Sequence, residues 1–120
     1  MSWQRLENFA QVGAIVSASA SRPQLIFRHS TRCSISQSAK FRLEADLQAL
    51  NAVYDIHFLD LLTYRDISRM IAERFDVVHQ SPQVIVVQNG KANYVATHYD
   101  IEAEDLLNFG KSAAIGTANS

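Results

Sequence analysis

The sequence predicts an α/β protein with a central mixed four-stranded sheet flanked by helices. Hydrophobic patterns of helical period alternate along the chain with short apolar runs typical of buried strands. An Asn-Gly pair separates the last two strand-like runs, which indicates an antiparallel hairpin. The single cysteine, Cys33, stands between the first strand-like run and the helix that follows it.

The first half of the chain predicts a helix, a strand and a second helix. Residues 7–21 carry apolar residues at helical spacing, at Phe9, Val12, Ile15 and Val16. The run QLIF at 24–27 follows a proline and reads as a buried strand. From Ile35 to Leu50 the apolar residues again lie along one helical face, so we expect a single helix there.

The second half adds a strand at 53–61 and then a helix whose apolar stripe is Ile67, Met70, Ile71 and Phe75. Two further strands surround Asn89-Gly90, and a short helix is expected at 102–109. We expect one domain over residues 1–110 and a flexible C-terminal tail over 111–120.

Composition excludes several classes of protein. Apolar residues make up 48% and charged residues 19% of the 120 residues, as in ordinary globular domains. The net charge of −1 and the lack of a basic cluster argue against nucleic acid as a partner. No apolar run approaches the roughly 20 residues of a membrane span. With one cysteine no internal disulfide can form, so we expect a cytoplasmic protein.

The surroundings of Cys33 favour a reactive thiol. Unpaired backbone N–H groups at a helix N-terminus favour negative charge, and a thiolate is the nucleophile in thiol–disulfide exchange. The alternative is an inert core residue, since free cysteines are often buried. Polar neighbours argue for the reactive interpretation, namely Ser30, Thr31, Arg32, Ser34 and Ser36.

The order of elements, with a cysteine after the first strand and Ser81-Pro82 before the third, resembles the thioredoxin fold. This resemblance implies that the Ser81-Pro82 bond is cis and faces Cys33. It also implies that Ser36 occupies the position of the second cysteine of thioredoxins. A protein with serine there can accept a thiol from a substrate but cannot release it by internal attack.

Three strings together resemble one family within this fold, the monothiol bacilliredoxins: IFRHSTRCSIS, LDLLTYRDISRMIAERFDV and SPQVIVVQNGK. The resemblance covers about residues 3–109. It implies that Cys33 attacks the mixed disulfide between bacillithiol and a client protein, with Ser36 at the resolving position. Ser81, Pro82 and Arg32 would contact the thiol substrate. Ser34 departs from the proline that the family often has after the cysteine.

The same resemblance implies bacillithiol, or a related low-molecular-weight thiol, as co-substrate and no tightly bound cofactor. Bacillithiol carries two carboxylates, so a basic rim near the cysteine would help to bind it. Its candidates are Arg28, Arg32, Lys40 and Arg65, although each is also explained as a solvated surface charge. His29 either favours the thiolate or packs in the core, and the four histidines lack the spacing of a metal site.

Two other functions remain open at this point. A monothiol protein of this fold could carry an iron–sulfur cluster, but the CGFS string of monothiol glutaredoxins is absent. A thioredoxin-fold interaction module would need no reactive sulfur, and a buried Cys33 would favour it.

Overall fold

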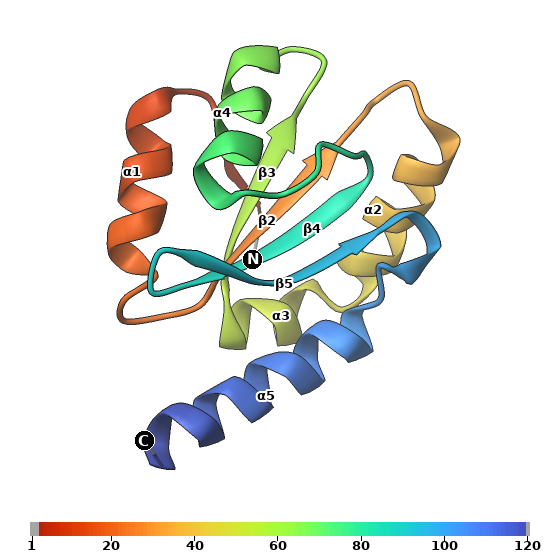
Figure 1. Ribbon diagram of the computed structural model, residues 1–120. Helices are drawn as coiled ribbons and strands as arrows, with labels where there is room; N and C mark the ends of the chain where they lie inside the picture. Colours follow the sequence, from red (N-terminus) through yellow and green to blue (C-terminus); the bar gives the residue numbers. More distant parts are fainter. Residues whose placement is uncertain (1–2, 120) are drawn as a thin grey trace.

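The computed structural model describes the backbone of residues 3–119 and the side chains of residues 3–112. Its centre is a five-stranded sheet with helices on both faces (Figure 1). The strands are β1 (Gln4–Arg5), β2 (Gln24–His29), β3 (Asp55–Asp60), β4 (Gln83–Gln88) and β5 (Lys91–Thr97). The helices are α1 (Phe9–Ala18), α2 (Ser34–Ala45), α3 (Leu47–Val53), α4 (Arg65–Phe75), the 3-10 turn η1 (His98–Asp100) and α5 (Ala103–Asn119).

The sheet is mixed, as predicted, but it has five strands and not four. The strand order is β1-β3-β2-β4-β5, in which β1, β3 and β2 run parallel and β4 and β5 are antiparallel to their neighbours. The additional strand is β1, which covers only Gln4 and Arg5 and pairs with β3. Two polar residues carry no strand pattern, so β1 exists only because β3 offers a free edge.

Two helical features also differ from expectation. The predicted helix over 35–50 is interrupted at Asp46, whose backbone leaves the helical region with φ −118° and ψ 22°. The C-terminal helix α5 runs to Asn119, further than the expected 102–109. The flexibility expected for 111–120 stays a prediction, and Ser120 lies outside the described residues.

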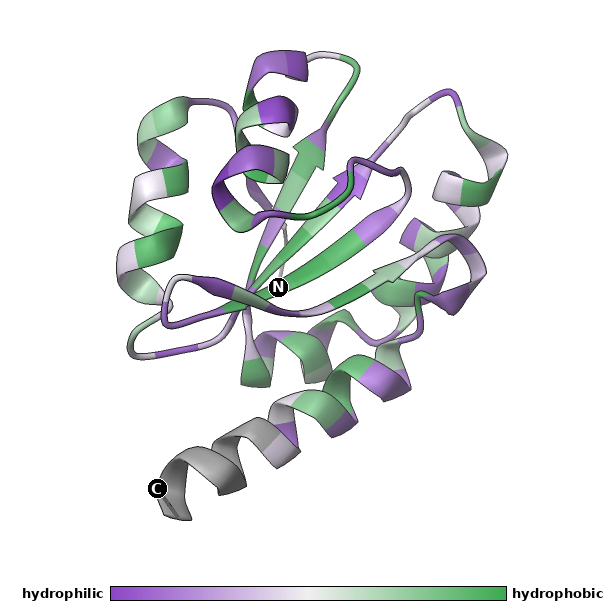
Figure 2. Cartoon of the chain, viewed as in Figure 1, coloured by the Kyte–Doolittle hydropathy of each residue, from purple (hydrophilic) through white to green (hydrophobic). Residues whose placement is uncertain are grey.

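Two hydrophobic cores lie on opposite faces of the sheet, because residues that alternate along each strand point to opposite sides. Helices α2, α3 and α5 cover one face, where Leu43, Leu50 and Leu106 share one buried core with Phe27. Helices α1 and α4 cover the other face and its separate core of buried residues, Leu6, Val12, Ile15, Ile26, Leu59, Ile67, Ile71, Phe75, Ile85 and Val87. The central strands are accordingly the most hydrophobic part of the ribbon (Figure 2).

The predicted Asn-Gly hairpin is confirmed. Asn89 and Gly90 both have positive φ, 52° and 77°, as a type I′ turn requires, and Gln88 pairs directly with Lys91. Ser19 at the end of α1 holds this turn, because its carbonyl accepts from the Asn89 N–H and its hydroxyl from the Gly90 N–H.

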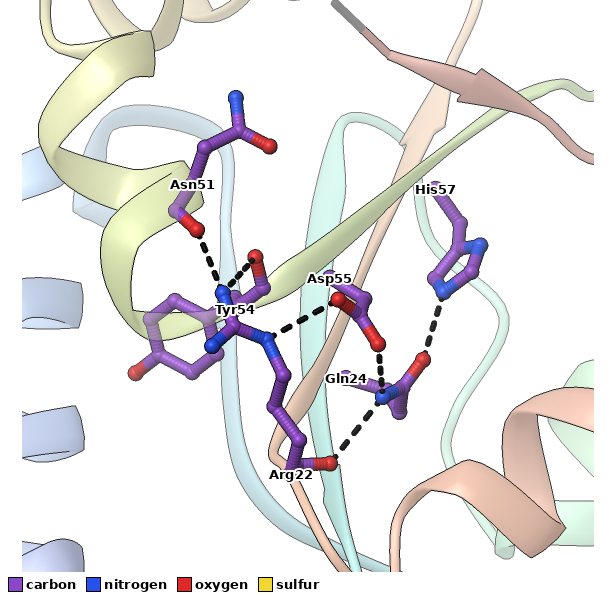
Figure 3. A network of polar contacts seen from close by, with 6 residues as sticks. All are labelled: Arg22, Gln24, Asn51, Tyr54, Asp55 and His57. Atoms are coloured by element: carbon purple, nitrogen blue, oxygen red, sulfur yellow. Dashed lines mark hydrogen bonds and ion pairs between the residues drawn. The ribbon is translucent and has the colours of Figure 1, made fainter. Parts of the chain in front are cut away.

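A polar network ties the chain together where β2 and β3 begin (Figure 3). Asp55 accepts from Arg22 Nε at 2.9 Å and from Gln24 Nε2 at 2.8 Å. Gln24 Oε1 in turn accepts from His57 Nε2 at 2.8 Å. Arg22 also donates to the carbonyls of Asn51 and Tyr54 at the end of α3. The network therefore joins the loop before β2, the end of α3 and strand β3.

Among the described residues, no helix combines the length and the apolar character that crossing a membrane would require.

Candidate active site

Cys33 caps the N-terminus of α2, as predicted, and is partly exposed. Its backbone is extended, with φ −107° and ψ 122°, and its carbonyl accepts the first helical hydrogen bond, from Gln37 N–H at 3.0 Å. Its own N–H donates to Ser30 O at 3.2 Å, which turns the loop tightly back from β2. Gln37 Nε2 donates to Thr31 O and fixes the same loop from the helix side. The thiol is therefore held at the helix start, where backbone N–H groups are unpaired.

Ser36 is fully buried and faces the end of β2. Its hydroxyl accepts from the Ser30 N–H at 3.0 Å and lies 2.6 Å from His29 Nδ1. The sequence suggested that this hydroxyl could point back at the sulfur of Cys33. The structure gives it two partners instead, one on β2 and one at the start of the loop that carries the cysteine.

His29 is buried among aromatic rings, with centroids 5.5 Å from Phe27 and 5.3 Å from Phe58. Burial lowers the pKa of His29, and the nearby Lys40 acts in the same direction. A neutral imidazole at neutral pH offers no positive charge to a thiolate. Of the two interpretations of His29, the structure favours packing and a hydrogen bond.

The Ser81-Pro82 peptide bond is cis, as the resemblance implied. The antiparallel register pairs Arg28 with Gln83, so one position further along Pro82 lies beside His29. Cys33 follows four residues after His29 and is hydrogen-bonded back to Ser30. The cis proline and the cysteine loop therefore leave the same end of neighbouring strands.

His98 completes this end of the sheet and was not predicted. Its N–H donates to Pro82 O at 3.0 Å, and its backbone has a positive φ of 54°. Arg42 of α2 donates to the carbonyls of His98 and Ile101, which joins η1 to the helix that carries Cys33. A histidine at the end of a strand gives no sequence signal for this role, although histidine tolerates positive φ better than most residues.

The predicted basic rim stays a prediction, and the structure corrects one of its four candidates. Arg32 is exposed beside Cys33, and Arg65 is exposed at the start of α4. Lys40 pairs with Glu44 at 3.0 Å. Arg28 was wrongly placed on the rim, because its side chain is fully buried on the α4 side of the sheet. Alternation along β2 explains this error, since Arg28 shares its face with the core residue Ile26.

Within the part of the chain that the structure describes, no group of three or more His, Cys, Asp or Glu side chains is arranged to hold a metal ion.

Comparisons with known proteins bear on both fold and family. A sequence profile of the family described as Monothiol bacilliredoxin BrxC matches residues 4–106. A solved protein named as a candidate oxidoreductase with a thioredoxin fold is 25% identical, with a TM-score of 0.75 over 90% of this chain and 92% of that chain. Thioredoxin from Malassezia sympodialis is 13% identical, with a TM-score of 0.70 over 92% of this chain and 90% of its own. Oxidised thioredoxin from Plasmodium falciparum is 11% identical, with a TM-score of 0.69 over 90% and 97%.

The two thioredoxins share the fold at low identity, so they establish the architecture alone. The family profile covers most of the chain, including the cysteine loop, α2 and the segment around the cis proline. The fold and the redox-protein character that the sequence suggested are thereby confirmed. This chain belongs to the monothiol bacilliredoxin family, within the thioredoxin-like proteins.

Proposed function

We propose that this protein is a monothiol thiol–disulfide oxidoreductase that removes bacillithiol, or a related low-molecular-weight thiol, from mixed disulfides on client proteins. The Cys33 thiolate attacks the sulfur that belongs to the small thiol. The client leaves as its thiolate, and a disulfide between Cys33 and the small thiol remains. One disulfide bond breaks and one forms, so no other oxidant or reductant takes part in this step.

The observation that carries this proposal is the position of Cys33. The only cysteine of the chain is partly exposed at the N-terminus of α2, at the sheet end where the cis Ser81-Pro82 bond lies. An interaction module with an incidental cysteine would not require the sulfur to be accessible there.

Ser36 sets the course of the second step. It stands where a resolving cysteine would stand, and its hydroxyl is hydrogen-bonded within the site. No internal disulfide can form, so a second small thiol must attack the mixed disulfide on Cys33. This attack restores the Cys33 thiolate and releases the two small thiols joined as a disulfide. Such turnover needs a pool of reduced thiol, which fits a cytoplasmic location.

Ser81, Pro82 and Arg32 form the proposed binding groups for the thiol substrate. The backbone of Ser81 is suited to pair with the cysteinyl part of the thiol, because it extends β4 towards the cysteine loop. Exposed Arg32 can attract carboxylates of the thiol through solvent. Holding the three sulfurs in line is the main contribution that such contacts can make to the rate.

Mass spectrometry of the purified protein tests this proposal directly. The protein is exposed separately to oxidised bacillithiol, oxidised glutathione and oxidised coenzyme A. We expect a mass increase of one thiol on Cys33, with bacillithiol the fastest of the three. A client model carrying bacillithiol should then be released with the thiol transferred to Cys33.

Cys33→Ser provides the control for this experiment. It should abolish transfer and leave the thermal unfolding midpoint nearly unchanged, since serine is well accepted at a helix N-cap. Transfer by Cys33→Ser at the wild-type rate, or the lack of an adduct with any of the three disulfides, would falsify the proposal.

A further inference from the structure

Arg28 is a buried cation without a carboxylate partner among the described residues. Its side chain is fully buried, and its Nη2 donates to Ser68 O at a long 3.3 Å. Its Nε and Nη1 have no hydrogen-bond partner among the described residues. The ion pairs found in the same part of the chain involve Arg22, Lys40 and Arg69 but not Arg28.

A charge in this position is costly unless something compensates it. Burial lowers the pKa of Arg28 to about 10, so the guanidinium keeps its proton at neutral pH. Buried charges in proteins are as a rule paired or fully hydrogen-bonded, because the loss of hydration costs several kcal/mol per ion. The protein itself supplies one carbonyl oxygen to this cation. The remaining donors are available to an anion.

Other buried polar atoms without a partner among the described residues belong to the start of β4 and the segment before it. The buried side-chain nitrogen and oxygen atoms that lack a partner among the described residues are Nε and Nη1 of Arg28, Oγ of Ser81 and Oε1 of Gln83. Arg28 and Gln83 are paired across β2 and β4, and Ser81 precedes Gln83 by two positions. The register puts Arg28 and Gln83 on the α4 side of the sheet, and Ser81 stands just before β4, separated from Gln83 by the cis proline. These four are the buried side-chain nitrogen and oxygen atoms without a partner in the described part of the chain.

The segment between α4 and β4 encloses this cluster and borders an open hollow. Gln83 Nε2 donates to Val78 O at 2.9 Å, and His79 Nε2 lies 2.9 Å from Ser68 Oγ. Gln83 also lines a hollow of about 300 Å³, together with Val78, Gln80, Thr97 and the carboxylate-bearing Asp76.

We propose that Arg28 and Ser81 form a binding site for one small monovalent anion, a carboxylate or a halide, behind the cis proline. The guanidinium contributes the charge and two N–H donors, and the Ser81 hydroxyl contributes a third. Gln83 Oε1 is an acceptor and cannot bind an anion, so the proposed donors are those of Arg28 and Ser81 alone. Because Ser81 belongs to both sites, occupancy at Arg28 fixes the segment that receives the thiol.

Two sources can supply this anion. One is a carboxylate of the low-molecular-weight thiol itself, and that source rests on the function proposed above. The other is a free anion such as chloride, which is independent of any thiol chemistry. The shared chemistry is a compact, singly charged group that accepts hydrogen bonds from Arg28.

Thermal unfolding in different sodium salts tests for the site without any redox reaction. At constant ionic strength, chloride and acetate are titrated against isethionate, a bulkier sulfonate. We expect chloride or acetate to raise the unfolding midpoint of the wild-type protein by a few degrees, in a saturable manner, as a ligand of the folded state does. Arg28→Met should lose this dependence and Arg28→Lys should keep part of it.

Arg69→Met is the matched control, because Arg69 is an exposed arginine of α4 next to Ser68. It removes the same charge from the same region and should retain the wild-type response to anions. If Arg28→Met fails to fold, crystals of the wild-type protein soaked in bromide give the answer. An anomalous peak within hydrogen-bond distance of Arg28 Nε or Nη1 supports the site, and ordered water alone at these atoms overturns it for halides.

The carboxylate source is tested with two model disulfides that differ by one group, a peptide carrying cysteine and the same peptide carrying cysteamine. We expect wild-type protein and Arg69→Met to accept the cysteine adduct with a roughly tenfold lower KM, as one charged hydrogen bond allows. Arg28→Met should accept both adducts with the same KM.

These results separate the site from the proposed function. In one outcome, exchange on Cys33 depends neither on the carboxylate nor on added anion, and the unfolding midpoints do not depend on the choice of anion. This outcome overturns the Arg28 site and leaves the proposed oxidoreductase function intact. Anion-dependent stability in a protein that forms no thiol adduct has the opposite meaning: the site stands and the proposed function fails.

Discussion

The two ends of β2 hold polar side chains in opposite ways. At the start of the strand, Gln24 and its neighbours form a network in which Arg22, Asp55 and His57 are joined by hydrogen bonds (Figure 3). At the other end, Arg28 and the neighbouring Ser81 and Gln83 keep buried polar atoms without partners among the described residues. Both ends belong to the same strand of the same sheet. Whether their buried polar side chains have hydrogen-bond partners therefore depends on the residues at each end and not on the type of fold.

The contrast separates polar groups that hold the chain from those that are available to a ligand. A satisfied network joins segments but has no bonding capacity left for another molecule. An unsatisfied buried group costs stability, and it persists at positions where binding or reaction compensates for it. We therefore expect changes near Gln24 to affect the free energy of unfolding, and changes near Cys33 to affect exchange.

The largest effect is expected from Ser36→Cys. A second thiol at this position can attack the disulfide between Cys33 and the bound small thiol from within the molecule. The effective concentration of a neighbouring thiol exceeds the concentration of a thiol in solution. The lifetime of the mixed disulfide should therefore fall by at least about tenfold. Quenched-flow mass spectrometry measures this lifetime.

Ser38→Cys serves as the control for Ser36→Cys, since Ser38 is exposed two residues further along α2. It adds the same thiol without placing it at the resolving position, so the lifetime of the mixed disulfide should stay near that of the wild type. Equal shortening in both variants would mean that the position of the second thiol is unimportant.

Low pH should destabilise the protein through His57, which belongs to the hydrogen-bonded network at the start of β2. Burial lowers the pKa of His57 to about 4 from the usual 6.5. Between these two pH values the imidazole is protonated in the unfolded chain but neutral in the folded one. The free energy of unfolding should therefore fall as the pH drops from about 6.5 towards 4. This residue alone accounts for roughly 2–3 kcal/mol between pH 7 and pH 4.5.

Urea unfolding of the wild type and of His57→Gln at the two pH values measures this contribution. Glutamine can still donate to Gln24, but it does not titrate, so the variant should lose stability less steeply. In this variant the lowered pKa values of His29 and His79 still make the free energy of unfolding fall with decreasing pH, but less steeply. An identical pH dependence in both proteins would contradict the assignment to His57.

Asp55→Ala should cost about 1–2 kcal/mol of the free energy of unfolding, because it removes acceptors from both Arg22 and Gln24. The Arg22–Asp55 pair is partly exposed, which keeps the cost at the lower end for an ion pair. Exchange on Cys33 should be unaffected.

Asp66→Ala is the counterpart of Asp55→Ala on the surface. Asp66 lies 3.8 Å from Arg69 with both side chains largely exposed, so the change should cost less than about 0.5 kcal/mol. Chemical denaturation of the two variants compares them directly.

The effect of Arg32→Ala on exchange is expected to be smaller than that of Ser36→Cys. Arg32 is exposed beside Cys33, so its attraction for a carboxylate is screened by salt. We expect KM for the thiol-bearing client to rise about threefold at low ionic strength, with unfolding unchanged. At high ionic strength the difference from the wild type should disappear, and its persistence would indicate a direct contact instead.

Local patterns predicted the parts of this fold that depend on local chemistry. The Asn89-Gly90 turn follows from backbone preferences that these two residues express in any context. The position of Cys33 at the start of α2 follows from the helical apolar pattern that begins at Ile35. Strand β1 and the break at Asp46 could not be predicted, since they depend on a free sheet edge and on the packing of the second helical segment.

The site was predicted only where a motif marks it. Cys33, Ser36 and the cis Ser81-Pro82 bond are carried by the family strings. The burial of Arg28 and the contact of His98 with Pro82 depend on strand faces and on a turn that only the assembled sheet defines. An arginine in a sequence is usually expected at the surface. The burial of Arg28 could be predicted only if the register of β2 and β4 were already known.

Trp3 gives the molecule a built-in optical probe. It is the only tryptophan, its ring stacks on Phe27 with centroids 5.5 Å apart, and its indole N–H donates to Glu44 of α2 at 3.1 Å. One fluorophore thus touches both the strand that leads to Cys33 and the helix that Cys33 caps. Its emission spectrum should follow any shift between these two elements when a thiol occupies the sulfur, so that exchange can be recorded in real time without a label.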